Sequence, residues 1–536
     1  MKTTLFTKYF MAATISAMIA GCGQEESLNG YESIIPGEEL EIVVNDIGFT
    51  NEDPASRVSE TDYKTTFTDG DEIGIYIISG NTVAQKNLKA EKSADGWSVE
   101  GLYNYEGANY IAYFPYDENM TTEDIKSEDD IVTYFDSKFT ENQSLEDSYK
   151  ICDLMTANVE AENGTVTFNL SHKRSMLEFV IPTYMYKTGD GDDAYTYSIP
   201  LGLEIKIGDV TYNPRFMGDC VYRCIVKPST DAAEISFSGS FTDAKQNKPV
   251  TFAKENIALA ANGCITYNIT YQDAPGTEVQ TRAIAVGDYY YSDGNIYPWD
   301  FPAPPTAGCL GVIFSTTTNS ETAKDGETAC SHGYVLSLYN ATGNTNGNLG
   351  AWDYYMWDNT DDNNNKISTI GLTDVAYAGN DGAVDESLIS DLKGLKYTDI
   401  IMKEMAASGV DKLYHAISTY GAEGNSTAKY AAPLFTTGWF VPSVGQCVKL
   451  VRELGGFTSF DGSKQTNSDV FTKIEDALSK VGGELDSNTA NGKFWTSNTS
   501  DNKQIYLLEL KKDENKCQIW TAGVGSKYRI RPILAF

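Results

Sequence analysis

The chain has 536 residues, and its 75 acidic side chains outnumber its 41 basic ones, which gives a formal net charge of −34. A surface this acidic repels the phosphates of nucleic acids and anionic lipid headgroups, so nucleic-acid binding is excluded. The length is enough for about three domains of roughly 150 residues each, and an aromatic content of 12% is typical of folded β-structure and not of a disordered acidic chain.

The first 21 residues have the features of an export signal. Lys2 and Lys8 precede an apolar run over residues 9–20, which is too short to span a bilayer as a permanent helix. Small residues end this run just before Cys22, and this pattern resembles the bacterial lipobox, in which the thiol is alkylated by a diacylglycerol and the peptide is cut before the cysteine. We therefore expect residues 1–21 to be a lipoprotein signal peptide and Cys22 to carry the lipid. An ordinary secretory signal with a chance cysteine is the alternative.

An acidic stretch over residues 23–27 follows this cysteine. It resembles the surface-export signal of lipoproteins from Gram-negative gut and oral anaerobes. The resemblance implies an outer-membrane lipoprotein that is displayed at the cell surface. No cofactor is expected apart from the diacylglycerol and palmitate-type acyl chains on Cys22.

The other eight cysteines are widely scattered along the chain. In an oxidising compartment they could pair as disulfides, or they could be small hydrophobic residues buried as thiols. Both interpretations stay open. Since the chain has no CxxC pair and only three histidines, no structural metal site is expected.

Residues 22–60 are acidic and contain one apolar stretch, 40–44, which predicts a first strand. From residue 61 to about 275, apolar residues recur at every second position. Examples are Ile73, Ile75 and Ile77; Val166, Phe168 and Leu170; Leu177, Phe179 and Ile181; Leu201, Leu203, Ile205 and Ile207; and Ile265, Tyr267, Ile269 and Tyr271. Strict alternation predicts strands with one buried and one wet face, as in antiparallel sandwiches.

A Pro- and Gly-containing linker at 273–277 precedes a region of mixed character. Ser443 followed by Gln446 fits a helix capping box. Val470, Ile474 and Leu478 recur at helical spacing, and Gly482 suits the end of that helix. Further strands are expected at 505–510, 518–521 and 528–536. This pattern predicts an α+β domain over residues 283–536.

Three segments of the alternating region resemble, in the same order, signatures of the fimbrillin family of type V pilins. They are TTFTDGDEIGIYII (65–78), ENQSLEDSYKICDLMTA (141–157) and VTFNLSHKRSMLEFVIP (166–182). The resemblance implies a mostly β protein with two antiparallel β-sandwich domains of the transthyretin-like kind, at 61–180 and 181–275. Residues 22–60 would then be a propeptide that contains the first strand.

The remaining part of the chain resembles the C-type-lectin-like module that is appended to some fimbrillins and is related in fold to formylglycine-generating enzymes. The resemblance rests on AVGDYYYSDGNIYPW (285–299), HGYVLSLYNA (332–341), GWFVPSVGQCVKLV (438–451), FWTSNTS (494–500) and YRIRPILAF (528–536). These motifs indicate fold more than ligand.

The fimbrillin resemblance implies a mechanism of assembly. Family members are cut after an arginine by a trypsin-like protease, and a strand from another pilin subunit then replaces the released one by strand addition. Arg57, followed by Val58, matches that position, and it is the only arginine between Cys22 and the first domain. A solvated charge with no role is the alternative for Arg57. Arg282, in the interdomain linker, could also be cut.

The chain closes with residues 530–536, which the second resemblance places inside a folded domain. We therefore expect a subunit that accepts a strand but does not donate one. Such a subunit is a tip or accessory pilin that presents its last module as an adhesin for a host or bacterial glycan or protein. The rival interpretation is a permanently anchored glycan- or protein-binding lipoprotein that never polymerises.

Two sets of residues in the last module could contact a glycan, because aromatic faces beside carboxylates and amides suit sugar binding. They are Trp352, Trp357, Asp358 and Asp361 in one run, and Trp495 with Asn498 in another. A solvated loop beside core aromatics is the alternative for the first run. The chain has no nucleophile elbow, HExxH motif or phosphate loop, so an enzyme is not expected.

Overall fold

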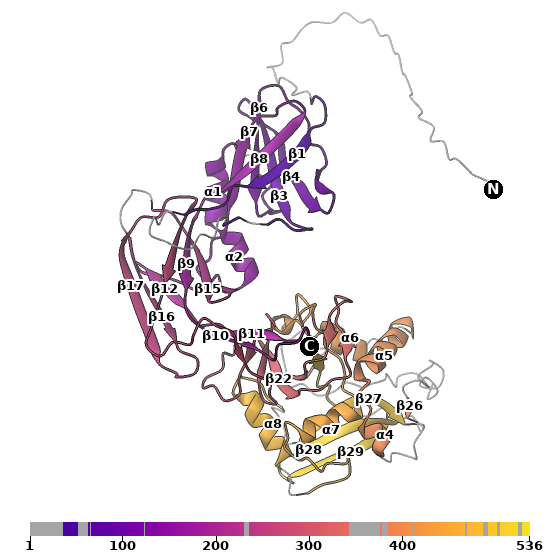
Figure 1. Cartoon of the computed structure of the whole chain (residues 1–536). Helices are drawn as coiled ribbons and strands as arrows, with labels where there is room; N and C mark the ends of the chain where they lie inside the picture. Colours follow the sequence, from indigo (N-terminus) through magenta and orange to yellow (C-terminus); the bar gives the residue numbers. More distant parts are fainter. Residues whose placement is uncertain are drawn as a thin grey trace, which may run out of the picture. The chain divides into compact units, whose positions relative to one another are not determined.

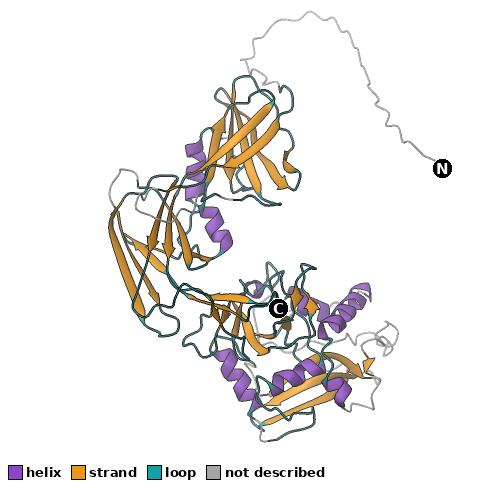
Figure 2. Cartoon of the chain, in the orientation of Figure 1, coloured by secondary structure: helices purple, strands orange, loops and turns teal. Residues whose placement is uncertain are grey.

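The computed structural model shows two compact units in which strands predominate (Figures 1 and 2). The first unit is drawn from Met1–Asp46, Thr66–Ile131 and Thr156–Leu170, and the second from Ile47–Thr65, Val132–Met155 and Ser171–Phe536. The residues that the structure describes are 36–51, 63–64, 66–122, 124–229, 235–341, 376–377, 384–408, 412–466, 469–485, 491–500, 504–523 and 528–536.

The first unit is built on a seven-stranded sheet with the order β1-β8-β7-β6-β3-β4-β5. The helix α1 (Glu128–Asp136) begins in this unit. The strands are β1 (Glu41–Asp46), β3 (Glu72–Ser79), β4 (Thr82–Ser93), β5 (Gly96–Val99), β6 (Ala108–Phe114), β7 (Met155–Val159) and β8 (Thr165–His172). The expected first strand is therefore confirmed as β1.

The central strand β3 is covered on both faces, which differs from the one wet face that its alternation predicts. Ile73, Ile75 and Ile77 are fully buried, but so is Tyr76 on the opposite face. The hydroxyl of Tyr76 donates to the carbonyl oxygen of Met120, 2.5 Å away, and Met120 is itself buried. The segment after β6 thus covers the face that the pattern predicts to be wet.

Two sheets in the second unit share one hydrophobic core, and we call residues 175–180 and 201–271, which carry all of their strands except β2, the two-sheet region. β9 (Ser175–Val180) contributes Leu177 and Phe179 to this core, and β16 (Ile235–Thr242) contributes Phe237 and Phe241. One sheet has the order β14-β15-β9-β18-β2 and the other β13-β12-β16-β17. The further strands are β2 (Thr50–Asn51), β12 (Glu204–Ile207), β13 (Val210–Tyr212), β14 (Arg215–Gly218), β15 (Val221–Val226), β17 (Pro249–Ile257) and β18 (Gly263–Asn268).

These sheets differ from the expected arrangement in two respects. β9 belongs to the two-sheet region, so the expected boundary between residues 180 and 181 falls at the end of one of its strands. The expected antiparallel pairing is also incomplete, since β18 runs parallel to both β9 and β2. Parallel neighbours need a crossover, and here the partner strands come from distant parts of the chain. The short helix α2 (Glu146–Cys152) packs near β15.

The rest of the chain combines sheets and helices, as the sequence predicts. A five-stranded sheet has the order β21-β20-β22-β25-β30, a four-stranded sheet has the order β26-β27-β28-β29, and β23 pairs with β24. The strands are β20 (Tyr289–Tyr291), β21 (Ile296–Tyr297), β22 (Cys309–Ser315), β23 (Glu321–Thr322), β24 (Ala329–Cys330), β25 (Tyr334–Ser337), β26 (Ala376–Tyr377), β27 (Asn491–Ser500), β28 (Gln504–Lys511), β29 (Lys516–Gly523) and β30 (Ile533–Ala535).

Helices complete this part of the chain, which we call the distal module. They are α4 (Glu386–Ile389), α5 (Gly394–Ser408), α6 (Lys412–Thr419), the 3₁₀ helix η2 (Ala428–Tyr430), α7 (Val444–Arg452) and α8 (Val470–Ser479). The capping box at the start of α7 is confirmed, because Ser443 and Gln446 each accept the other's backbone N–H. The periodicity of α8 is confirmed too: Ile474 and Leu478 are buried, and Gly482 follows with a φ of 76°.

A hairpin that precedes the linker belongs to the core of the distal module. β10 (Tyr184–Lys187) pairs with β11 (Thr196–Ile199), and on its other side with β19 (Gln280–Thr281). Tyr184, Tyr186, Tyr197 and Ile199 pack into the same hydrophobic cluster as β22 and α7. The first hairpin of the domain expected at 181–275 therefore packs in the core of the distal module and not in the two-sheet region.

All eight described cysteines are buried, and none forms a disulfide. Burial raises the pKa of the Cys309 and Cys330 thiols to about 12, so both stay protonated and unreactive at neutral pH. The described cysteines are thus core residues, which decides between the two interpretations of the sequence. Among the described residues, no helix is long and apolar enough to cross a membrane.

The Ser443 cap offers a test of the distal fold. Ser443 is fully buried, and its hydroxyl donates to the carbonyl of Asp391 at 2.5 Å besides accepting from Gln446 N–H at 3.3 Å. We expect Ser443→Ala to lower the free energy of unfolding by about 1–2 kcal/mol. A urea titration followed by tryptophan fluorescence measures this, since six of the seven tryptophans follow residue 283.

Asp469→Ala is the matched control, because Asp469 precedes α8 without capping it through its side chain. The side chain of Asp469 forms an exposed ion pair with Lys473, so we expect its replacement to lower the free energy of unfolding by at most about 0.5 kcal/mol. Equal losses in the two variants would contradict a stabilising role for the Ser443 cap.

Candidate functional site

The strand β1 lies at one edge of the seven-stranded sheet, where its backbone pairs in parallel with β8 (Figure 1). Glu41 pairs with Thr165 and Asp46 with Leu170, so the pairing is continuous over the whole strand. Just before β1, the N–H of Leu40 donates to the carbonyl of Leu102 at 2.9 Å. Backbone hydrogen bonds of this kind are independent of side-chain identity, so another strand could satisfy the same edge.

Side chains of β1 alternate between the sheet and the solvent. Leu40 and Val44 are 6% and 9% exposed, whereas Val43 between them is 41% exposed. Asn45 donates from Nδ2 to the side-chain oxygen of Asn169 at 3.1 Å on the exposed face. The edge of β8 thus presents apolar positions for every second residue of its partner strand.

The chain continues from β1 to β2, which pairs in parallel with the end of β18 in the second unit. The N–H of Thr50 donates to the carbonyl of Asn262 at 2.7 Å. Beside it, the ring of Phe49 stacks on the imidazole of His172, with centroids 3.7 Å apart and planes inclined by 19°. The segment 36–51 therefore supplies an edge strand to each of the two units.

Tyr63 lies beyond this segment and is anchored separately. Its hydroxyl lies 3.2 Å from the carboxylate of Glu178 and 2.9 Å from the hydroxyl of Thr266. Arg223 donates from Nε to the same carboxylate at 2.9 Å and lies over the Tyr63 ring. Burial is the main reason why the pKa of Tyr63 rises to about 12, so Tyr63 remains a neutral donor to Glu178.

Arg57 and Val58, the expected cleavage position, lie between these two anchored segments but outside the described residues, as does Cys22. A cut after Arg57 would leave Tyr63 covalently joined to the two-sheet region and would sever its covalent link to β1, β2 and Phe49. The described contacts therefore divide into those made by residues before the expected cut and those made by residues after it.

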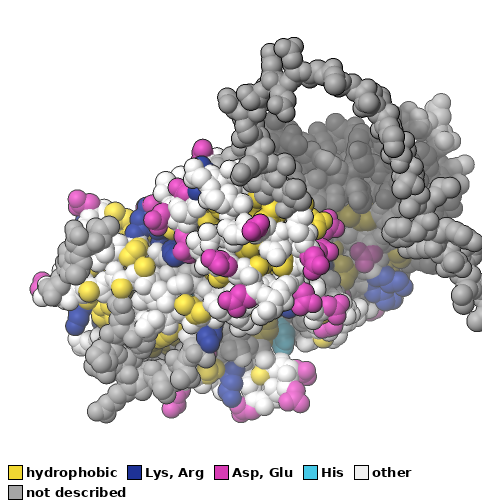
Figure 3. Space-filling view, turned by 90° about the horizontal axis from the view of Figure 1, so that it is seen from above, with side chains coloured by type: hydrophobic (Ala, Val, Ile, Leu, Met, Phe, Trp, Pro, Cys, Tyr) yellow, Lys and Arg dark blue, Asp and Glu magenta, His cyan; other side chains and the backbone are white. Residues whose placement is uncertain are grey.

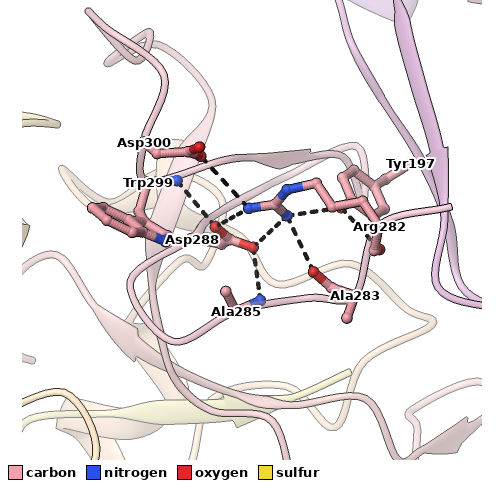
Figure 4. Close-up of polar contacts among 7 residues, drawn as sticks. All are labelled: Tyr197, Arg282, Ala283, Ala285, Asp288, Trp299 and Asp300. Carbon is pink, nitrogen blue, oxygen red and sulfur yellow. Dashed lines mark hydrogen bonds and ion pairs between the residues drawn. The ribbon is translucent and has the colours of Figure 1, made fainter. Parts of the chain in front are cut away.

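A second polar site lies where the linker enters the distal module (Figure 4). The two terminal nitrogens of Arg282 donate to the two carboxylate oxygens of Asp288 at 2.8 and 2.9 Å. One of them also donates to the hydroxyl of Tyr197 at 2.8 Å. Asp288 is fully buried and accepts the backbone N–H groups of Ala285 and Trp299 as well.

This pair is strongly held. Burial alone would lower the pKa of Arg282, but its hydrogen bonds to Asp288 and Tyr197 raise the pKa above the ordinary value for arginine, so the guanidinium is always charged. The bidentate geometry is the stronger kind of Arg–carboxylate contact. Sequence reasoning missed Asp288, although it lies within a motif that was used to infer the fold, because one aspartate in a turn carries no sign of burial.

The residues expected to bind a glycan are not brought together by the described contacts. Trp495 and Asn498 are 0% and 1% exposed. Asn498 accepts the N–H of Val444 at 2.7 Å and donates to Asp391 at 3.1 Å, so it joins α7 to β27. Neither side chain offers a surface to a ligand. The other run, Trp352, Trp357, Asp358 and Asp361, lies outside the described residues.

Acidic side chains are spread over the described surface. On the face drawn in Figure 3 they are more frequent than lysine and arginine, which occur singly or in small groups. Among the described residues, no group of three or more His, Cys, Asp or Glu is placed to hold a metal ion.

Residues 56–286 match the model of the family described as Fimbrillin-like. The match covers most of the first unit and the two-sheet region. This part of the chain is therefore similar to fimbrillin-like proteins.

Proteins similar to this chain include ones with fimbrial or adhesion names. One is named "Putative fimbrium tip subunit Fim1C", from Bacteroides ovatus; it is 25% identical, and the alignment covers 96% of each chain. A solved fimbrial protein from Bacteroides ovatus is 20% identical, with a TM-score of 0.46, over 94% of this chain and 100% of its own. A solved "putative cell adhesion protein" from Bacteroides uniformis is 21% identical, with a TM-score of 0.26, over 38% of this chain and 88% of its own.

The inward side chains of β1 can be tested against the outward ones. Val44→Asp places a charge at a buried position of the sheet edge, which costs several kcal/mol without a partner. We expect amide hydrogens of residues 41–46 to exchange at least about tenfold faster in this variant. Hydrogen–deuterium exchange with mass spectrometry measures the change.

Val43→Asp is the matched control on the exposed face of the same strand and should leave the exchange of β1 unchanged. Equal protection in both variants would show that β1 does not depend on its apolar alternation.

Proposed function

We propose that the chain is a structural and adhesive subunit of a fimbrium of the type V kind. It is made as a surface lipoprotein and joined to other pilin subunits by donor-strand exchange. The fimbrillin-like match and the fimbrial and adhesion relatives support a pilus subunit or adhesin at the cell surface. The observation that carries the proposal is β1, an edge strand with alternating apolar side chains that lies before Arg57 in the sequence.

Export and anchoring precede assembly in this proposal. The signal peptide ends at residue 21, and acylated Cys22 holds the subunit in the outer membrane until it is processed. A trypsin-like protease then cuts after Arg57, and the segment with β1 and β2 leaves. The vacated edge of β8 accepts a strand from another pilin, whose alternate side chains replace Leu40 and Val44.

The subunit takes a terminal place in the fimbrium, at the tip or as an accessory pilin. Residues 533–535 form β30, which pairs with β25 inside the five-stranded sheet, and Phe536 is 2% exposed. These residues are therefore committed to the core of the distal module and are not available as a donated strand. The relative named as a fimbrium tip subunit agrees with this position.

The distal module would then be the adhesive part, with a C-type-lectin-like fold that follows two β-sandwich domains in the sequence. Its ligand would be a glycan or a protein on a host or bacterial surface. The described contacts give Trp495 and Asn498 a packing role, so such a ligand would bind elsewhere on the module. The relative named as a fimbrium tip subunit agrees with a binding role.

A permanently anchored surface-binding lipoprotein is the second candidate. The stacking of Phe49 on His172 and the hydrogen bonds of Thr50 favour it, because they hold the amino-terminal segment on the second unit. The two candidates differ in whether residues 23–57 are removed.

Processing at Arg57 separates the candidates. We expect protein recovered from the cell surface to begin at Val58, because the protease needs an arginine at the cut. Arg57→Ala should retain acylated Cys22 and should not enter fimbriae. Intact mass and amino-terminal sequencing of surface protein measure both. Acylated Cys22 in all wild-type surface protein would exclude the strand-exchange proposal and leave the anchored lipoprotein.

A further inference from the structure

The chain has eight arginines, and seven of them lie in the part that the structure describes. None of these seven is exposed. Several are bound through charge-assisted hydrogen bonds: Arg174 to Asp136 at 2.6 Å, Arg215 to Glu146 at 3.1 Å, Arg223 to Glu178 at 2.9 Å, Arg282 to Asp288 at 2.8 and 2.9 Å, Arg452 to the carbonyl of Phe460 at 2.6 Å, and Arg531 to the carbonyl of Leu485 at 2.6 Å. Arg529 is 6% exposed and donates its backbone N–H to Lys493.

Arg282 differs from the other six in its surroundings. Residues 276–281 just before it are all exposed, and the strand β19 that contains two of them is only two residues long. The backbone N–H of Arg282 donates to the carbonyl of Lys187 at 2.9 Å, which extends this short pairing by one bond. Exposed connecting segments are the preferred sites of proteolytic nicking. The backbone alone would therefore leave the Arg282–Ala283 bond vulnerable.

The side chain supplies the missing protection. A trypsin-like protease binds the arginine before the cut through a carboxylate in its specificity pocket. Asp288 already binds the guanidinium in the same bidentate manner and is fully buried, so it competes directly with that pocket. The Arg282 side chain must leave Asp288 and Tyr197 before a protease can bind it (Figure 4).

We propose that Asp288 shields the Arg282–Ala283 bond, so that arginine-directed processing removes the amino-terminal segment without shedding the distal module. This inference rests on the proposed processing at Arg57 for its biological meaning. The shielding itself concerns a different bond and is measured separately.

The test uses the full chain without its signal peptide, incubated with an arginine-specific endoprotease. New amino termini are identified by sequencing and intact mass over time. For the wild type we expect a Val58 terminus and no Ala283 terminus. Asp288→Asn removes the negative charge and replaces one of the two acceptor oxygens by an NH₂ group. We expect an Ala283 terminus to form at least about tenfold faster in this variant, because the rate of cleavage follows the population in which Arg282 has left its site.

Asp300→Asn is the matched control. Asp300 lies 3.8 Å from the same guanidinium, but its side chain is 56% exposed and it forms the weaker contact. This variant should resist cleavage at Arg282 as the wild type does. An Ala283 terminus that forms equally fast in the wild type and in Asp288→Asn would overturn the proposal, and so would equal resistance in both.

Loss of folding in Asp288→Asn would be recognised by cuts at Arg452 and Arg529 as well, since both lie in the distal core. In that case the Tyr197→Phe variant tests the shielding, because it removes one hydrogen bond to Arg282 and leaves the buried carboxylate in place. Faster cutting at Arg282 alone supports the shield, and no change contradicts it. Absence of a Val58 terminus in the wild type would instead count against the proposed function and leave the result at Arg282 intact.

Discussion

The edge of β8 is the constraint on which the first unit depends, because its backbone N–H and C=O groups need a partner strand. β1 supplies that partner in parallel from Glu41 to Asp46. Most of the bonds belong to the main chain, Asn45 adds one side-chain hydrogen bond to Asn169, and Leu40 and Val44 add buried apolar contact. An edge satisfied in this way is stable while occupied and open to a replacement strand of similar alternation, which is the property that assembly by strand addition requires.

Continuity of the chain connects this edge to the second unit. The same segment that forms β1 goes on to Phe49 and β2, and the ring of Phe49 stacks on the imidazole of the buried His172. Nδ1 of His172 in turn lies 2.6 Å from a carboxylate oxygen of Asp153. Removal of the segment would therefore change one edge in each unit at once, whereas Tyr63 would keep its own contacts with Glu178 and Thr266. The proposed processing would thus change both units and not only the first.

Local sequence patterns predicted helices and strands well, but they did not predict which faces of a strand are buried by distant parts of the chain. The capping box of Ser443 and Gln446 and the helical spacing of Ile474 and Leu478 depend only on neighbours along the chain, so the sequence was enough. Burial of both faces of β3, by contrast, depends on the segment that crosses it, and alternation does not report that segment. The burial of Trp495 and the transfer of the β10–β11 hairpin to the distal core have the same cause, since both depend on contacts between distant residues.

The ion pair between Asp288 and Arg282 determines how the linker is attached to the distal module. A fully buried carboxylate is costly unless its charge is balanced and its oxygens accept hydrogen bonds. Arg282 balances it, and the N–H groups of Ala285 and Trp299 satisfy the remaining acceptor positions. Because Arg282 follows β19, and β19 pairs with the hairpin whose tyrosines fill the distal core, the ion pair fixes the linker to the module that it enters. The segment between the two-sheet region and the distal module is therefore fixed to the distal module at Arg282, even though the sequence around residue 275 predicts a linker.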